Sequence, residues 1–552
     1  MFRENQSHLQ RSLLDSSSFM NDRIHDKLMK TWAAPFYEHV FCQIDETPFA
    51  CLYCADNGRP NFPVNILLSL EFIKQLKNYT DEELIDQFYF NYQISYAVGL
   101  HCLGELHLGP RTLYDFRERV YRYALENPGE EDLIFGQFST LTTHFIEVLQ
   151  LNTKEQRTDS TMIMPNIKWA GRLSLAYDVL TQAAKACPES ILSKEIKTML
   201  EAKYKKELLY RTKSSETKTK LETMLALGQQ LLTATMPYPN LQNQKEIHLL
   251  KRFLNEQSDF DQASGHRVAK DSRDISPDSL QSAYDPDATY REKSGKKHKG
   301  YVANLIETCN QDNPVQVVTD YHLAANTTSD VELLKERLPI LKENMFVQDI
   351  YADGGYYGEE ALQLAQDTDV NLHFTNMTGR KTNSHKLPLT DFGIDEENYR
   401  ITTCPAGHAP LHSGRAKRSG SITAHFNRQQ CQACPNKDRC PVKFQKKSAV
   451  LRITSKALHA ARTRIQLEDR ASRLEATSKR AAIEGTNSAL KRGHGAAKLA
   501  VCTQAKSQTV FGLKVIGHNF RQFVRGLMIM AGRQAQDSEV PALSGGSLCF
   551  CS

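Results

Sequence analysis

Three carboxylates, Asp159, Asp353 and Glu484, stand in local settings that suit phosphoryl-transfer chemistry. The two aspartates are each predicted at a boundary between a strand and a turn, where the sites of α/β proteins are usually built. Carboxylate oxygens suit Mg²⁺, and two such ions can activate a nucleophile and stabilise a leaving oxygen. Residue type alone leaves the choice open, because other acids such as Asp285 or Glu475 could substitute.

Glu484 lies between two cations in a segment of strong helix formers. Arg480 precedes it by one helical turn and Lys491 follows two turns later, so the three side chains should project from roughly one face. Gly485 costs this helix about 1 kcal/mol relative to alanine. A surface helix with an ordinary Arg-Glu pair would show the same pattern, so this segment alone leaves both interpretations open.

The chain has 552 residues, long enough for several hydrophobic cores. Its content of 40% hydrophobic and 24% charged residues is typical of ordinary soluble proteins. It has no run of 18 apolar residues, and its first residues lack the apolar centre of a signal peptide. We therefore expect a cytoplasmic protein without membrane contact.

Positive charge is concentrated in one part of the chain. Residues 441–533 contain 19 Lys and Arg against 4 Asp and Glu, although the whole chain carries a net charge of only +5. This separation is expected of a protein that presents one region to a polyanion such as DNA. A solvated basic helical face is the alternative.

Three helices are predicted near the amino terminus, at 63–76, 80–99 and from 112 onward. A proline opens the first, and Thr80 is a candidate N-cap for the second. The third is basic and includes Arg117, with Arg111 just before it. Three short helices of this kind suit a helix-turn-helix-like contact with DNA, but a plain helical bundle gives the same pattern.

The middle of the chain predicts a mixed α/β sheet. Strands are expected at 300–308, 314–320, 347–353 and 371–374, and helices at 330–341 and 359–367. Successive strands followed by strand-helix alternation favour this fold class. A long charged segment at 173–275 has leucines at helical intervals and is expected to be helical.

A cysteine cluster lies in a loop-rich region: Cys404, Cys431, Cys434 and Cys440. Four thiolates on a segment without an evident core suit structural zinc, which would replace the missing hydrophobic core. Reduced, unligated thiols are the alternative. Cys51 and Cys54 also have a ligand-like spacing, but no second pair lies near them in sequence, so packed or free thiols are expected there.

The chain resembles the DDE transposases of bacterial insertion sequences, in the superfamily marked by Tyr-x2-Arg-x3-Glu-x6-Lys around the last acid. Arg480, Glu484 and Lys491 fit that spacing, and Thr477 stands where the family has tyrosine. The departure at Thr477 puts one DNA contact of the family in doubt without affecting the acids.

Other segments match the same transposases in order. Residues 158–161 resemble their first aspartate motif and 352–356 their second, while 61–120 resemble their amino-terminal helical domain. The resemblance implies a core like that of RNase H, in which Asp159, Asp353 and Glu484 hold two Mg²⁺ or Mn²⁺ ions. It also implies DNA contacts by Arg480 and Lys491, double-stranded element ends and target DNA as partners, and a homodimer on DNA.

The expected organisation follows from these assignments. We expect an unassigned segment at 1–60, a helical DNA-binding domain at 61–130, and a catalytic core from 150–172, 276–394 and 446–533. A helical insertion at 173–275, a zinc-binding insertion at 395–445 and a disordered tail at 534–552 complete the chain. The 194 residues from Asp159 to Asp353 and the 131 from Asp353 to Glu484 require such insertions.

The sequence therefore predicts a transposase that binds element ends and catalyses metal-dependent DNA cleavage and strand transfer. An inactive copy that only binds DNA is one alternative, and a metal-dependent DNA nuclease is another. All three acids favour activity, while the basic carboxyl-terminal segment favours long DNA over a small phosphate ester.

Overall fold

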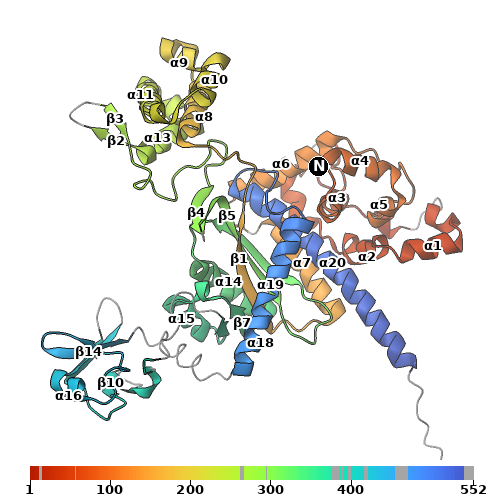
Figure 1. Cartoon of the computed structure of the whole chain (residues 1–552). Helices are drawn as coiled ribbons and strands as arrows, with labels where there is room; N and C mark the ends of the chain where they lie inside the picture. The colour runs from red at the N-terminus through yellow and green to blue at the C-terminus, as the bar shows by residue number, and fades with distance from the viewer. Residues whose placement is uncertain are drawn as a thin grey trace, which may run out of the picture.

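A mixed α/β sheet forms the centre of the computed structural model, and helices pack around it (Figure 1). The structure describes residues 1–10, 15–55, 58–127, 129–130, 132–261, 266–293, 295–375, 385–387, 389–395, 400–415, 421–453 and 470–539. Within these ranges, no helix combines the length and apolar character needed to cross a membrane.

The central sheet has the order β4-β5-β1-β7-β8, and β6 also pairs with β5. Its strands are β1 (Glu155–Ile163), β4 (Thr289–Lys293), β5 (Lys296–Thr308), β6 (Val318–Ala325), β7 (Asp349–Ala352) and β8 (Asn371–Phe374). β1, β7 and β8 run parallel to one another, whereas β5 is antiparallel to β1, β4 and β6. This sheet confirms the predicted α/β class.

Two helices connect the later strands of the sheet, α14 (Asp330–Met345) and α15 (Glu359–Asp367). α14 starts with a capping box in which Ser329 and Glu332 satisfy each other's free backbone N–H groups. Leucines of α14 and alanines of α15 are buried with Ile350 and Tyr356 in one hydrophobic cluster. The parallel half of the sheet is thereby fixed against these two helices.

The carboxyl-terminal helices lie beside the sheet (Figure 1). They are α18 (Arg470–Ala481), α19 (Ile483–Ser488), a π-helical turn at Ala489–Gly493, and the long α20 (Gln504–Glu539). α18 contacts β1 and β7, and α19 contacts β1. α20 continues to Glu539, so the first six residues of the predicted disordered tail are helical, and the rest of that tail lies outside the described residues.

The α-helices that precede the sheet in the described residues are α1 (Asp22–Met29), α2 (Ala33–His39), α3 (Val64–Lys77), α4 (Asp81–Phe90), α5 (Tyr92–Ala97), α6 (Pro110–Glu126) and α7 (Leu133–Leu149). The prediction of Thr80 as an N-cap is confirmed, because Thr80 and Glu83 form a capping box. The single helix predicted over 80–99 is interrupted, since the Asn91 side chain caps a new helix there.

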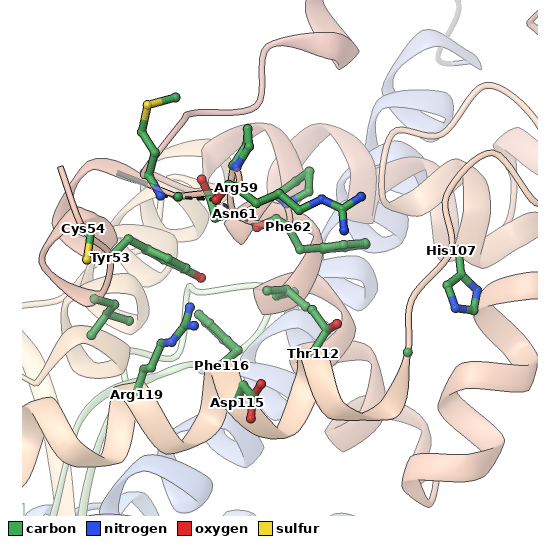
Figure 2. Close-up of a pocket in the computed structure, with 17 residues that line it drawn as sticks. Tyr53, Cys54, Arg59, Asn61, Phe62, His107, Thr112, Asp115, Phe116 and Arg119 are labelled. Atoms are coloured by element: carbon green, nitrogen blue, oxygen red, sulfur yellow. Dashed lines mark hydrogen bonds between the residues drawn. The ribbon is translucent and has the colours of Figure 1, made fainter. Parts of the chain in front are cut away.

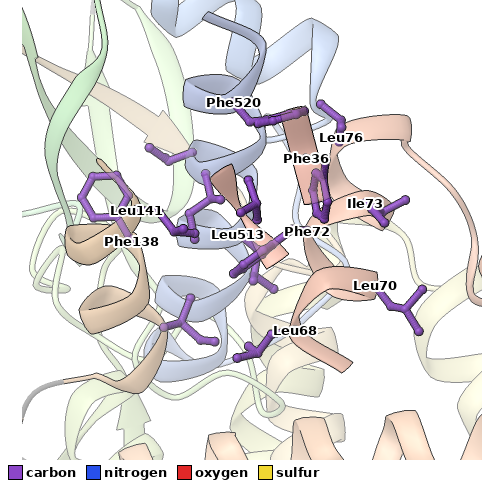
Figure 3. Packing of buried hydrophobic residues seen from close by; sticks show 14 of the residues in the cluster. Phe36, Leu68, Leu70, Phe72, Ile73, Leu76, Phe138, Leu141, Leu513 and Phe520 are labelled. Carbon is purple, nitrogen blue, oxygen red and sulfur yellow. The ribbon is translucent and has the colours of Figure 1, made fainter. Parts of the chain in front are cut away.

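One buried cluster joins the amino-terminal helices to the carboxyl-terminal ones. Figure 3 shows Phe36 of α2, Phe72 of α3 and Phe138 of α7 around Leu513 and Phe520 of α20. The rings of Phe36 and Phe520 meet edge to face with centroids 5.2 Å apart, a favoured geometry for aromatic pairs. α20 therefore connects segments from the two ends of the chain.

A helical unit lies between β1 and β4 in sequence and has a buried cluster of its own. It contains α8 (Arg172–Lys185), α9 (Lys194–Met199), α10 (Ala202–Tyr210), α11 (Thr217–Thr235), α12 (Pro239–Gln242) and α13 (Lys245–Gln257), with the hairpin β2 (Ser258–Asp261) and β3 (His266–Ala269). The helices were expected from the sequence, whereas the small hairpin was not.

The cysteine-rich region is a small β structure with its own buried cluster. Its elements are β9 (Gly393–Asp395), β10 (Arg400–Thr403), β11 (His412–Arg415), β12 (Ile422–Asn427), α16 (Arg428–Ala433), β13 (Lys443–Phe444) and β14 (Ser448–Ile453). Buried Phe392, Ile422 and Leu451 show that it has a hydrophobic core, contrary to the expectation. β14 lies beyond the predicted insertion at 395–445, so this β structure extends past that boundary.

Phe520→Ala should strongly destabilise the fold. The ring is only 2% exposed, and its loss leaves a cavity at the contact between α20 and α2, worth about 3–5 kcal/mol. We expect a lower midpoint of denaturant unfolding. Met528→Ala on the same helix is the control, because Met528 is 65% exposed. Equal effects of the two substitutions would contradict the proposed role of this contact.

Candidate active site

Asp159 lies on β1, and Asp353 directly follows the neighbouring parallel strand β7. The paired register of β1 and β7 ends with Arg157 opposite Tyr351, two residues before each aspartate. The two aspartates are thus carried by adjacent segments of the chain. Asp159 lies in the middle of β1 rather than at its end, which corrects the expected boundary, while Asp353 directly follows β7 as predicted.

Glu484 is brought to the two aspartates by Arg480. The Arg480 guanidinium lies 3.1 Å from Asp159, 3.6 Å from Asp353 and 2.9 Å from Glu484. The Arg480 and Asp159 side chains are 12% and 14% exposed, whereas Glu484 is 64% exposed. The three acids that the sequence singled out thus surround one cation, with Glu484 on the solvent side.

The charges at this centre act strongly on one another. Burial raises the pKa of Asp159, and Arg480 opposes this rise while the nearby Asp353 adds to it. Burial acts to lower the pKa of Arg480, but the three carboxylates together raise it. The site holds more carboxylates than cations and is suited to further positive charge.

Asn487 is a site residue that sequence reasoning missed. Its side-chain amide donates to Asp159 across 3.0 Å, and its own carbonyl oxygen is buried without a hydrogen-bond partner in the described part of the chain. Asn487 follows Glu484 by three residues, so it lies on the same side of the helix. That spacing was visible in the sequence, but no chemistry distinguished it from a surface asparagine.

A buried ion pair lies beside the site, on β1 and the neighbouring strand β5. Arg157 of β1 contacts Glu307 of β5 at 2.6 Å, and their side chains are 9% and 1% exposed. Thr486 donates to Glu307 across 2.7 Å, and Arg157 donates to the backbone oxygen of Lys479 across 2.9 Å. These bonds fix the helices that carry Arg480 and Glu484 against the sheet.

The predicted DNA-contacting residues have different surroundings. Lys491 is half-buried in the π-helical turn; burial lowers its pKa, and Asp159 opposes that shift. Arg111 is 92% exposed and lies 3.6 Å from Asp115. Thr477 donates its hydroxyl to the backbone oxygen of Arg473 within its own helix.

Arg117, also predicted to contact DNA, pairs with two carboxylates of the amino-terminal helices. Its guanidinium lies 2.7 Å from Glu71 and 2.6 Å from Asp81, and its side chain is 17% exposed. Burial acts to lower the Arg117 pKa, but the two carboxylates raise it, while the contacts of Arg117 and Lys74 lower the Asp81 pKa to about 2 against the effect of burial. The charge of Arg117 is thus neutralised inside the amino-terminal helices.

The carboxylate centre fits divalent metal ions in its chemistry. It offers hard oxygen ligands that are partly buried, and a guanidinium already lies between them as a cation. As the side chains stand, no three His, Cys, Asp or Glu residues in the described ranges form a group that could hold a metal ion. Metal binding at this centre would therefore require side-chain movement, including a shift of Arg480.

The four predicted zinc ligands are gathered in the small β region. Cys404, Cys431 and Cys440 pack against its core, and all four thiols, Cys434 included, are half-buried. Burial raises the pKa of Cys431 and of Cys440, and neighbouring thiols of the cluster raise both further. The thiols are thus near one another, although the arrangement does not meet the geometry of a metal site.

A separate cavity of about 950 Å³ lies among the amino-terminal helices and contains none of the three acids. Figure 2 shows Arg59 and Arg119 at this cavity, with Tyr53 and Phe62. Arg119 stacks over the Tyr53 ring at 4.8 Å, so its charge is partly engaged by a cation–π contact.

Models of known protein families match two separate parts of the chain. Residues 27–119 match a family model described as a transposase domain (DUF772), and residues 403–524 match one described as a transposase DDE domain. No curated protein and no solved structure matches the chain. The second match includes Glu484 and Arg480 but neither aspartate.

The two matches, in this order along one chain, support a DDE transposase of an insertion sequence, in agreement with the resemblance.

Arg480→Gln should lower the thermal unfolding midpoint at neutral pH. Without its guanidinium, Asp159 and Asp353 remain close together in a partly buried site, and removing one partner of a buried ion pair costs up to about 3–5 kcal/mol. Arg492→Gln is the matched control, since Arg492 is exposed. Thermal unfolding followed by circular dichroism measures the difference.

The effect of Arg480→Gln should depend on pH. Loss of the cation raises the Asp159 pKa further, so the destabilisation is present above that pKa and diminishes as the pH falls through it and Asp159 becomes protonated. A deficit that stays constant from pH 8 down to about pH 4, near the ordinary pKa of an aspartate, would count against this electrostatic role.

Proposed function

We propose that this transposase cuts DNA at the ends of its insertion sequence and joins the freed 3′-hydroxyl to target DNA. The observation that carries the proposal is the convergence of Asp159, Asp353 and Glu484 around Arg480. Three acids from two strands and a helix, far apart in sequence, meet at one point beside a half-buried lysine, Lys491. The spacing of Arg480, Glu484 and Lys491 supports membership of the Tyr-Arg-Glu-Lys superfamily, and the sheet order supports a core like that of RNase H.

Asp159, Asp353 and Glu484 would hold the divalent ions, with Mg²⁺ or Mn²⁺ as the candidates. When bound, two such ions activate an attacking oxygen and stabilise the leaving oxygen of a phosphodiester. Asn487 orients Asp159 through its amide hydrogen bond. Arg480 neutralises the carboxylates before metal and DNA bind, and can then turn toward a phosphate oxygen.

The proposed substrate is double-stranded DNA, because both family matches describe transposase domains. The Asp159 carboxylate raises the pKa of Lys491 against the effect of burial, and we propose that Lys491 attracts a phosphate near the scissile bond. Since transposition brings two element ends together, we further propose a homodimer assembled on DNA.

Asp353→Asn should abolish cleavage of DNA that carries the element ends. Loss of one ligand should reduce nicking in the presence of Mg²⁺ by at least about a hundredfold. Asp312→Asn is the control, because Asp312 is exposed in the loop between β5 and β6. Gel electrophoresis of labelled duplexes separates nicked products from joined products.

The outcomes of this assay distinguish the possible functions. Joined products from the wild type, lost in Asp353→Asn, support a transposase with strand transfer. Nicked products alone indicate a metal-dependent nuclease. Binding of element ends by the wild type without any nicking indicates a copy that has lost catalysis and overturns the proposal.

The cysteine cluster is proposed as a structural zinc site. Thiolates bind Zn²⁺ once deprotonated, and metal binding would draw Cys404, Cys431, Cys434 and Cys440 together. The small core of this region offers few buried side chains, so a metal would contribute much of its stability.

Cys434→Ser should remove zinc from the purified protein. We expect about one zinc ion per wild-type chain by elemental analysis, from the four-ligand composition of structural sites. Cys51→Ser should retain the metal, because Cys51 lies in an exposed turn of the amino-terminal region. A wild type without zinc, or a Cys434→Ser protein with unchanged zinc content, would refute the site.

A further inference from the structure

Asp330 is a buried acid close to Asp353 that the proposed cleavage chemistry does not use. It is the first residue of α14 and is only 8% exposed. An acid in the first turn of a helix is ordinarily stabilised by the helix dipole while it remains in contact with water. Asp330 is largely removed from water, so its carboxylate requires a further favourable contact.

The described residues do not supply that contact. The Oδ1 atom of Asp330 is buried, and no donor in the described part of the chain hydrogen-bonds to it. Within the same residues, no Lys, Arg or His nitrogen lies within 4.0 Å of this carboxylate. A buried charge without a partner is costly to the folded state. The position therefore favours a cation that is not a side chain of these residues.

The Asp330 carboxylate approaches Asp353 at a glycine. Gly355 lies in the turn Gly354–Tyr356, directly after Asp353. A Cβ on Gly355 would be 2.6 Å from Asp330 Oδ2 and 2.9 Å from Asp353 Oδ1. Oxygens of the two acids thus border one small space, which the side chain of any other residue at this position would occupy. Gly355 is exposed, so solvent reaches this turn.

Both acids are held in place by the elements that carry them. The Gly355 N–H donates to Asp353 Oδ1 across 2.8 Å. The same turn packs on the start of α14, because a Cβ on Gly358 would be 3.0 Å from the Val331 side chain. Asp353 Oδ2 is the atom that lies 3.6 Å from Arg480. Asp353 therefore contacts Arg480 with one oxygen and approaches Asp330 with the other.

A divalent cation suits this pair of carboxylates. Two negative charges so close together repel each other unless a positive charge lies near both. Mg²⁺ in proteins is often bound through only one or two carboxylates, and water or substrate phosphates complete its coordination. The exposed turn leaves room for such ligands on the solvent side.

We propose that Asp330 and Asp353 bind one divalent cation between them at Gly355, which makes Asp330 a fourth carboxylate of the metal site. The inference rests on the proposed function in one respect, that the carboxylate site takes Mg²⁺ or Mn²⁺. Because Arg480 contacts the other oxygen of Asp353, a cation at Oδ1 can bind while Arg480 keeps its ion pairs.

Binding of Mn²⁺ to the DNA-free protein tests this assignment. Asp330→Asn should weaken Mn²⁺ binding by about tenfold or more, measured by isothermal titration calorimetry. Glu359→Gln is the matched control, because Glu359 is likewise an acid at the first residue of its helix but is exposed. The control should bind Mn²⁺ as the wild type does.

Thermal unfolding separates a metal ligand from a merely structural acid. Without metal, Asp330→Asn should raise the unfolding midpoint, because one of two neighbouring carboxylates loses its charge. Added MnCl₂ should then raise the midpoint of the wild type more than that of Asp330→Asn. A lower midpoint without metal, together with an unchanged response to MnCl₂, would show that Asp330 only stabilises α14 and would overturn the proposal.

Gly355→Ala tests the same space while retaining every acid. Its Cβ would lie between the two carboxylate oxygens, so Mn²⁺ binding should weaken as it does in Asp330→Asn. Gly358→Ala is the control in the same turn, because the nearest atoms to a Cβ there all belong to Val331. Equal Mn²⁺ affinities of the wild type, Asp330→Asn and Gly355→Ala would mean that only water occupies this space, and would overturn the proposal.

The result is separable from the test of cleavage. A wild type that binds Mn²⁺ through Asp330 but does not nick DNA supports the cation site and refutes the cleavage function. A wild type that nicks DNA, with the same Mn²⁺ affinity as Asp330→Asn, supports cleavage and refutes the role of Asp330. A wild type that binds no Mn²⁺ in the absence of DNA also refutes the cation site, whatever its activity.

Discussion

Two aspartates lie close together at this site, so the repulsion between their negative charges must be offset by a cation. Parallel pairing of β1 with β7 brings the segments that carry Asp159 and Asp353 next to each other, and Arg480 is a shared counter-ion to both. In a partly buried environment such charges interact far more strongly than in water. The cations of this balance include Arg480 of α18 and Lys491 of the π-helical turn.

The same balance of charges depends on how α18 and α19, which carry Arg480 and Glu484, are attached to the sheet. Arg480 can contact both aspartates only if α18 keeps its position against β1. The buried pair of Arg157 and Glu307 provides that fixation, because separating it would leave an uncompensated charge in the interior. The buried pair therefore helps to set the position of the charged groups that lie beside it on the same face of the sheet.

Sequence reasoning found the three acids but not all that supports them. Each acid stands in a recognisable order of motifs, so Asp159, Asp353 and Glu484 could be selected from 64 acidic residues. β4 could not be found, because Thr289–Lys293 is polar and shows no apolar alternation. Glu307 lies within a predicted strand, but its ion pair with Arg157 could not be predicted, because the partner of a buried acid depends on the fold.

The ion pairs of Arg117 also could not be predicted from the sequence. Its helix and its apolar face were predicted, and a basic helix near the amino terminus suggested DNA. Which arginine turns inward depends on the crossing of α6 over α3 and α4, where Glu71 and Asp81 lie. Such crossings follow from side-chain packing between segments far apart in the chain, which a single sequence does not specify.

The position of α20 has a consequence for how the protein forms during synthesis. Phe36, Phe72 and Phe138 leave the ribosome several hundred residues before Leu513 and Phe520, which complete their packing. Until then the nascent chain exposes an apolar surface that has no partner, a state prone to aggregation or to capture by chaperones. Since α20 also packs on β6 and follows the helix of Glu484, completion of the central sheet and of the amino-terminal helices becomes a single late event.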